Sequence, residues 1–206
     1  CGARRSFSRG WMHGMPQAIK DLAETKGLRT TRGSPLFRDH VPDHDCLMVS
    51  RMRRAGALVI GKTNVPEFGK GSHSFNEVFG VTRNPYDTGR TAGGSSGGAA
   101  VALATRMLPV ADGSDFMGSL RNPAAWNNVF GLRPSQGLVP RWPRAEFWLN
   151  QLAIEGPMAR NVRDLARLLA TQSGADPRDP MSFGSSYAVP EHWSDASSLK
   201  GLRIGW

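Results

Sequence analysis

Residues 93–98 read Gly-Gly-Ser-Ser-Gly-Gly, and residues 115–124 read Asp-Phe-Met-Gly-Ser-Leu-Arg-Asn-Pro-Ala. Between these two loops lies Ala99–Ala104, a run of small residues that predicts a helix packed closely against its neighbours. A serine in a glycine-rich loop is most often a turn former, but two such loops flanking one helix raise the hypothesis of nucleophilic catalysis. The first loop matches the pattern G-x-S-x-G twice, with Ser95 or Ser96 at its centre.

Three common serine or glycine motifs do not explain this sequence. An esterase nucleophile elbow needs a strand before the serine and a histidine after it, but Thr88–Ala92 is a poor strand and His192 is the only later histidine. A phosphate-binding loop needs Gly-Lys-Ser/Thr, and no lysine follows these glycines. Ser197–Lys200 fits S-x-x-K, a short pattern that arises easily by chance.

The flanking segments predict an α/β fold. Asp43 and Asp45 stand where a helix N-cap is expected, before an apolar pattern that ends at Gly56. Ala57–Ile60 then suits a buried strand, and helix followed by buried strand is typical of α/β proteins. Shorter patterns indicate a strand at Met15–Lys20 and an apolar segment at Val110-Ala111, which precedes a Gly/Ser loop over 113–119.

The last third of the chain predicts one clear amphipathic helix. Asn161 caps it, Gly174 ends it, and its apolar face holds Val162, Leu165, Leu168 and Leu169. A loop over 175–198 and a strand starting at Leu202 are expected to follow.

Composition excludes some classes of partner. The chain has 206 residues and a formal net charge of +9, and residues 1–70 hold 13 basic against 6 acidic side chains. No Lys/Arg run exceeds two residues and no aromatic residues are interleaved with them, so we expect a solvated surface and no nucleic-acid partner. No apolar run approaches the roughly 18 residues of a membrane helix, so no membrane partner is expected either.

The cysteines, histidines and methionines indicate neither a disulfide framework nor a metal site. Cys1 and Cys46 are the only cysteines, and one possible pair is no disulfide framework, which favours a reducing compartment and a cytoplasmic location. The histidines and methionines show no arrangement typical of metal ligation. We therefore expect neither a metal nor another cofactor.

A third segment joins the two loops in one long pattern. Residues 14–21 read Gly-Met-Pro-Gln-Ala-Ile-Lys-Asp, with Lys20 placed 75 residues before Ser95, and Ser119 follows Ser95 by 24 residues. Together the three segments resemble the amidase signature family, whose catalytic lysine and two serines have this spacing. The resemblance runs from about His13 to the end of the chain.

The resemblance implies a Ser-Ser-Lys triad. Ser119 would be the nucleophile that forms an acyl-enzyme with the amide carbonyl, and Ser95, held by a cis peptide bond in the family, would bridge it to Lys20 as general base. A lysine with an ordinary pKa is neutral in only about one molecule in 2,500 at pH 7, so burial must lower the pKa of Lys20. Asp21 would oppose that shift only if it faced Lys20, and adjacent strand residues point to opposite faces.

By the same resemblance, an oxyanion hole would be formed by the backbone N–H groups of Phe116, Met117, Gly118 and Ser119. The sequence departs from the family at Met117, where a small residue is usual, and the larger side chain is expected to narrow the acyl pocket. The backbone N–H remains available provided that Met117 does not need a positive φ. We expect Asp115 and Arg121 to form a structural ion pair that pins this loop.

The implied fold is an amidase-signature core of α/β class, a mixed twisted sheet flanked by helices. We expect residues 1–12 to be an unpatterned tail and residues 13–206 to be a partial domain, truncated at both ends, that contains the catalytic core. The expected activity is hydrolysis of a linear carboxylic amide, and the partner is a small-molecule amide. Two alternatives stay open: the A subunit of a glutamyl-tRNA amidotransferase, which hydrolyses glutamine, and a non-catalytic truncated remnant. The sequence leaves open the identity of the amide and the oligomeric state.

Overall fold

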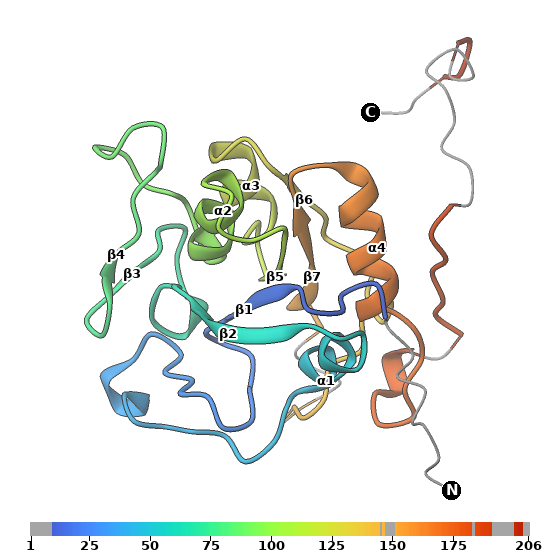
Figure 1. Cartoon of the computed structure of the whole chain (residues 1–206), viewed down its shortest axis with the longest axis horizontal. Helices are drawn as coiled ribbons and strands as arrows, with labels where there is room; N and C mark the ends of the chain where they lie inside the picture. Colours follow the sequence, from blue (N-terminus) through green and yellow to red (C-terminus); the bar gives the residue numbers. More distant parts are fainter. Residues whose placement is uncertain (1–9, 145, 147–150, 183, 191–199, 204–206) are drawn as a thin grey trace, which may run out of the picture.

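The computed structural model describes residues 10–144, 146, 151–182, 184–190 and 200–203 (Figure 1). Within these ranges the chain mixes helices with parallel and antiparallel strand pairs, so the fold is α/β as expected. Of the expected elements, residues 1–9 of the tail, residues 191–198 of the long loop and residues 204–206 of the final strand lie outside the described residues.

The strands that are described form three small sheets. β1 (Pro16–Lys20) pairs in parallel with β2 (Leu58–Thr63), and a register shift lies between Gln17 and Ala18. β7 (Ile154–Ala159) is the centre of an antiparallel sheet, with β5 (Val110–Asp115) on one side and β6 (Phe130–Gly131) on the other. The third sheet is the hairpin of β3 (Phe75–Asn76) and β4 (Gly80–Val81).

In the part of the chain that the structure describes, four α-helices surround these strands. They are α1 (Leu47–Arg54), α2 (Gly97–Ala104), α3 (Arg121–Trp126) and α4 (Val162–Gln172), and three short 3-10 helices lie at η1 (Pro35–Phe37), η2 (Glu67–Gly69) and η3 (Pro180–Ser182). α4 packs along β7, while α2 packs against β5 (Figure 1). None of the helices in the described ranges is long and apolar enough to cross a bilayer.

Two buried apolar clusters form the core, with β5 and β7 between them. Successive residues of β5 point to opposite faces, so Val110 joins one cluster and Ala111 the other. The first cluster lies between β1, α1 and α4, and the second lies under α2 and α3. Because Asp112 and Ser114 share a face of β5 with Val110, the polar end of that face is directed toward β1.

The structure confirms two of the sequence-predicted helices closely. The small-residue helix is α2, in which Ala99, Ala100 and Leu103 are buried. In α4 the Asn161 side chain accepts a hydrogen bond from the backbone N–H of Asp164 at 2.9 Å, as expected of an N-cap.

The cap of α1 was predicted wrongly. The N-cap residue is Cys46, and no side chain caps the helix. Asp45 instead accepts a hydrogen bond from the Lys26 N–H at 2.8 Å and pairs with Arg53 at 3.1 Å. A tertiary contact has therefore taken the carboxylate that the local pattern assigned to the helix end. Gly56, with φ of 101°, follows the helix end as expected.

Two strands also differ from expectation. β2 begins at Leu58 and continues to Thr63, and Leu58 and Ile60 are exposed rather than buried, because they point away from the core. β5 runs on through Asp115, where a loop from residue 113 was expected, because its polar residues stay paired with β7.

Met12 belongs to the expected tail but is fully buried in the first core cluster. The backbone N–H of Met12 donates to the Ala55 carbonyl at 3.2 Å, so the chain is packed against the core from this residue onward. The division of the chain between residues 12 and 13 stays a prediction.

Candidate active site

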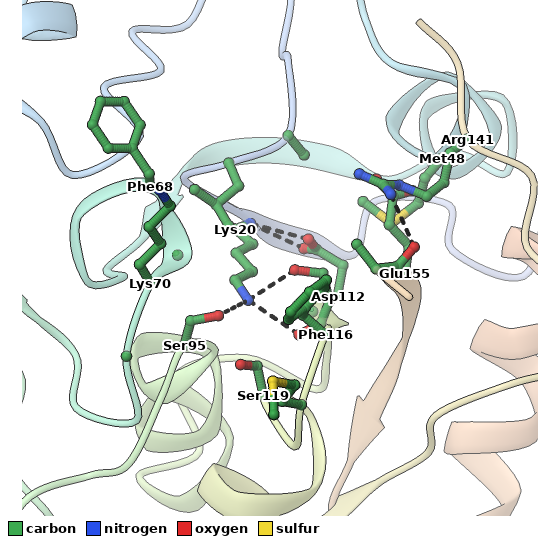
Figure 2. Close-up of a pocket in the computed structure, with 18 of the residues that line it drawn as sticks. Lys20, Met48, Phe68, Lys70, Ser95, Asp112, Phe116, Ser119, Arg141 and Glu155 are labelled. Carbon is green, nitrogen blue, oxygen red and sulfur yellow. Dashed lines mark hydrogen bonds and ion pairs between the residues drawn. The ribbon is translucent and has the colours of Figure 1, made fainter. Parts of the chain in front are cut away.

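A cavity of about 640 Å³ opens between β1, β5, β7 and the loops that precede α2 and α3. It brings together the three residues that the sequence singled out, Lys20, Ser95 and Ser119 (Figure 2). Apolar side chains from Met48, Phe68, Phe116 and Met117 line other parts of its wall, and Asp112, Arg141 and Glu155 add charge.

Lys20 is the last residue of β1 and its side chain is buried, with 2% of the residue exposed. Its Nζ donates to the Oγ of Ser95 and of Ser96, each at 2.8 Å. It also contacts Ser114, with the Oγ at 2.9 Å and the backbone carbonyl at 3.2 Å. Ser96 and Ser114 thus hold the lysine together with Ser95.

Burial lowers the pKa of Lys20 from 10.5 to about 7, because the interior disfavours its charged form. Three carboxylates oppose this shift, in the order Asp112, Asp115 and Glu155. The sequence-based requirement for a lowered pKa is therefore met. Asp21 is absent from these charges, since its carboxylate points the other way and accepts a hydrogen bond from the Thr31 N–H at 3.1 Å.

Ser95 lies immediately before α2, and the Gly94–Ser95 peptide bond is cis, as the resemblance implied. The glycines around it allow very close backbone contacts. A Cβ on Gly98 would lie 2.3 Å from the Asn64 backbone nitrogen, and one on Gly94 would lie 2.9 Å from that of His73. Only glycine fits these two positions without moving the neighbouring backbone.

Ser119 follows β5 and faces the same cavity, half-buried (Figure 2). Its backbone carbonyl accepts a hydrogen bond from the Ser96 N–H at 3.2 Å, which ties the two serine loops together. Within the described residues its hydroxyl makes no hydrogen bond, so the Lys20–Ser95 contact is formed while the Ser95–Ser119 contact is not.

The loop that carries Ser119 is held by Asp115, whose side chain is fully buried. Its carboxylate accepts hydrogen bonds from the N–H groups of Gly118 at 2.8 Å and Leu120 at 3.1 Å. It also pairs with Arg121 at 3.0 Å, as predicted, and with Arg133 at 3.1 Å, which the sequence did not indicate. Hydrogen bonds from Arg121 and the loop N–H groups hold the pKa of Asp115 well below its usual range, despite its burial.

The four backbone N–H groups expected to form the oxyanion hole are not all available in this structure. The N–H of Gly118 is engaged by Asp115 and so is not directed at the cavity. In the described part of the chain the N–H groups of Phe116, Met117 and Ser119 have no hydrogen-bond partner. Met117 is 79% exposed. Its φ is not positive, which was the condition for its backbone N–H to remain available as a donor.

Sequence reasoning missed Asp112 and Glu155, both of which line the cavity beside Lys20. Desolvation raises the pKa of Asp112 to about 6 and also raises that of Glu155. The available signal for Asp112 was an acidic residue directly after the apolar Val110-Ala111 segment and directly before the Gly/Ser loop. In the described ranges, no group of three or more His, Cys, Asp and Glu side chains is arranged to hold a metal ion.

The chain matches a known family model and is similar in sequence to known proteins. The family model described as Amidase matches residues 2–206. The A subunit of the glutamyl-tRNA(Gln) amidotransferase of Sulfurisphaera tokodaii is 46% identical over 183 residues, which is 89% of this chain and 39% of that protein. The protein of the same name from Thermus thermophilus is 45% identical over 194 residues, 93% of this chain and 40% of that protein. The chain thus spans about two fifths of the length of these relatives.

The fold is also similar to those of solved structures. The A subunit of the Thermotoga maritima glutamyl-tRNA(Gln) amidotransferase matches with a TM-score of 0.76 and 38% identity, over 85% of this chain and 38% of that one. A bacterial aryl acylamidase of the amidase signature enzymes matches with a TM-score of 0.80 and 36% identity, over 87% of this chain and 38% of that one.

Proposed function

This chain belongs to the amidase signature family, and on that premise we propose that it hydrolyses a carboxylic amide through Lys20, Ser95 and Ser119. The observation that carries the proposal is the contact of 2.8 Å between the buried Nζ of Lys20 and the Oγ of Ser95. A buried amine with a pKa of about 7 is neutral in about half of the molecules at pH 7, so a base is available at neutral pH.

The proposed reaction proceeds in two halves. Neutral Lys20 takes the proton of Ser119 through Ser95, while the Ser119 Oγ attacks the amide carbonyl carbon. The proton then passes to the nitrogen of the leaving group as the C–N bond breaks, which releases ammonia or an amine and leaves an ester on Ser119. Water attacks this ester by the same proton route and releases the carboxylic acid.

The Phe116–Ser119 loop supports the oxyanion step. Its free N–H groups are stabilising donors for the oxygen that gains charge when the carbonyl is attacked, and loss of one such donor typically costs roughly 3 kcal/mol of activation free energy. Since Gly118 is held by Asp115, we assign this role to Phe116, Met117 and Ser119.

For the substrate, we propose the amide of glutamine. The relatives named above are subunits of a glutamyl-tRNA(Gln) amidotransferase, which supports this alternative over the hydrolysis of a simple linear amide. It also means that the expected absence of a nucleic-acid partner is not supported. Simple amides are the second candidate, because an aryl acylamidase has a similar structure.

The test is a comparison of glutamine with simple aliphatic and aryl amides as substrates of the purified protein, with and without Lys20→Met. We expect Lys20→Met to lower kcat by about 100-fold or more, as removal of a general base does. Lys62→Met is the matched control, since Lys62 is half-buried and does not line the cavity, and its Nζ is bound to Thr25, Thr30 and the Ala23 carbonyl.

A fluorophosphonate probe adds a second readout. It should label Ser119 in the folded protein and fail to label Ser119→Ala. Folded protein that neither turns over amides nor reacts with the probe would favour the non-catalytic remnant. Activity retained in Lys20→Met would refute the triad.

A further inference from the structure

Asp112 is a buried carboxylate that the proposed reaction does not use. It lies in the middle of β5, is 1% exposed and lines the cavity. Its two oxygens accept the backbone N–H of Lys20, at 3.0 Å from Oδ2 and 3.3 Å from Oδ1 (Figure 2). A carboxylate that is fully desolvated and bound to the catalytic lysine needs an explanation, because burying such a charge is unfavourable.

The contact supplies a link that the sheets lack. Among the described strands β1 is paired only with β2, so no carbonyl of β5 completes the ladder on the other side of β1. The side chain of Asp112 takes the place of that carbonyl and holds the last residue of β1 against β5. This sets where the Lys20 side chain starts, and thus its reach to Ser95.

Asp112 is also the leading counter-charge to the lysine. The charges that act on Lys20 are Asp112 and Asp115 from β5 and Glu155 from β7, and Asp112 opposes the lowering of the Lys20 pKa most strongly. Asp115 is neutralised by Arg121 and Arg133, and Glu155 lies 3.9 Å from Arg141. Apart from Lys20, the titratable groups around Asp112 are Lys62 of β2, Glu155 and the thiol of Cys46, and burial raises the pKa of that thiol.

We propose that Asp112 is a positioning residue for Lys20, which fixes the end of β1 beside Ser95 and supplies the counter-charge for the ammonium formed whenever Lys20 takes a proton. The inference rests on the proposed role of Lys20 as the base and deepens it. Burial lowers the basicity of the lysine, and Asp112 restores part of it.

Asparagine separates the two roles of this side chain. Asp112→Asn keeps an oxygen that can accept the Lys20 N–H but removes the negative charge. A purely structural Asp112 would leave the pH dependence unchanged in this variant. A counter-charge, once removed, lets the pKa of Lys20 fall further, so the acid limb of the pH profile moves to lower pH.

The experiment measures kcat/KM against pH for the purified protein and for Asp112→Asn, with Asp21→Asn as matched control. Asp21 is adjacent to Lys20 in sequence and equally buried, but is not among the charges acting on it. We expect the acid limb to move by about one pH unit to lower pH in Asp112→Asn, by less in Glu155→Gln, and not in Asp21→Asn. Competitive acetylation of the Lys20 amine, followed by mass spectrometry, should show the same shift without relying on turnover.

An unmoved profile and an unmoved acetylation curve in Asp112→Asn would overturn the inference. If Asp112→Asn does not fold, Asp112→Ser offers a second uncharged acceptor with the same expectation. Failure of the proposed function is seen separately, as activity retained in Lys20→Met.

Discussion

The Nζ of Lys20 and the Oγ of Ser95 lie 2.8 Å apart, although 75 residues separate them in the chain. One is the last residue of β1 and the other lies in the loop just before α2, and at most 2% of either residue is exposed. Because both residues are buried and already in contact, the pair is preorganised before any substrate enters the cavity.

The first prediction concerns pH. Since only neutral Lys20 accepts a proton, kcat/KM should rise with pH and reach half its plateau near pH 7, where the lowered pKa of Lys20 lies. The Lys20 contribution to the free energy of unfolding should also rise from pH 7 to 10.5, because the unfolded chain binds more protons in that window. A pH series of initial rates checks the first statement, and a half-maximal rate near pH 10 would contradict it.

The second prediction concerns Asp115. Asp115→Asn should lower the free energy of unfolding by about 2–4 kcal/mol, because the amide keeps only one acceptor oxygen, so one of the two buried N–H donors loses its partner, and because Arg133 loses its counter-charge. Arg121 is half exposed, so solvent screens its share of the loss. The kcat should fall as well, since the loop carries the nucleophile. Urea unfolding measures the first effect.

Asp87→Asn is the control for this variant. Asp87 pairs with Arg90 at 2.9 Å, but both side chains are more than half exposed, so the loss should stay below about 1 kcal/mol. Equal losses in Asp87→Asn and Asp115→Asn would show that the buried network adds no stability.

The third prediction concerns backbone contact at α2. Gly98→Ala should destabilise the protein by about 1–3 kcal/mol and lower kcat, because its Cβ would push α2 away from Asn64 and move Ser95 with it. Gly61→Ala is the control, since a Cβ at Gly61 in β2 meets no atom within 4 Å. Thermal unfolding and initial rates measure both effects, and a Gly98→Ala protein as stable and active as Gly61→Ala would refute the argument.

The fourth prediction concerns substrate size. Met117→Ala should raise kcat/KM for amides with bulky acyl groups by about tenfold, while rates on small amides change little, because the side chain stands at the cavity wall. Met107→Ala removes another exposed methionine that does not line the cavity. A gain of the same size in both variants would exclude a steric role for Met117.

The features that could be predicted from the sequence are those that depend on a local residue pattern or on a long motif. The α4 helix follows from its apolar periodicity and from Asn161, and the meeting of Lys20 with Ser95 is what the family resemblance implies. Both rest on residues whose partners are either nearby or implied by the family resemblance.

The sequence could not predict features whose cause is a distant partner. Asp45 leaves the end of α1 because Arg53 and the Lys26 N–H bind it. Asp112 is 92 residues from Lys20, so no local pattern connects them. The exposure of Leu58 and Ile60 depends on which face of β2 the core covers, which an apolar run alone does not specify.

The oxygen atoms around Lys20 have a consequence for the direction of each hydrogen bond. Four of them lie within 3.2 Å of the Nζ, whereas an ammonium has three hydrogens and a neutral amine has two hydrogens and a lone pair. With the ammonium present, Ser95 receives a hydrogen from Nζ and its own hydroxyl hydrogen is free to point toward Ser119. With the neutral amine, Ser95 gives its hydrogen to the lone pair and can receive one from Ser119. One proton on Lys20 therefore reverses the polarity of Ser95, so the same hydroxyl serves as donor in one half of the cycle and as acceptor in the other.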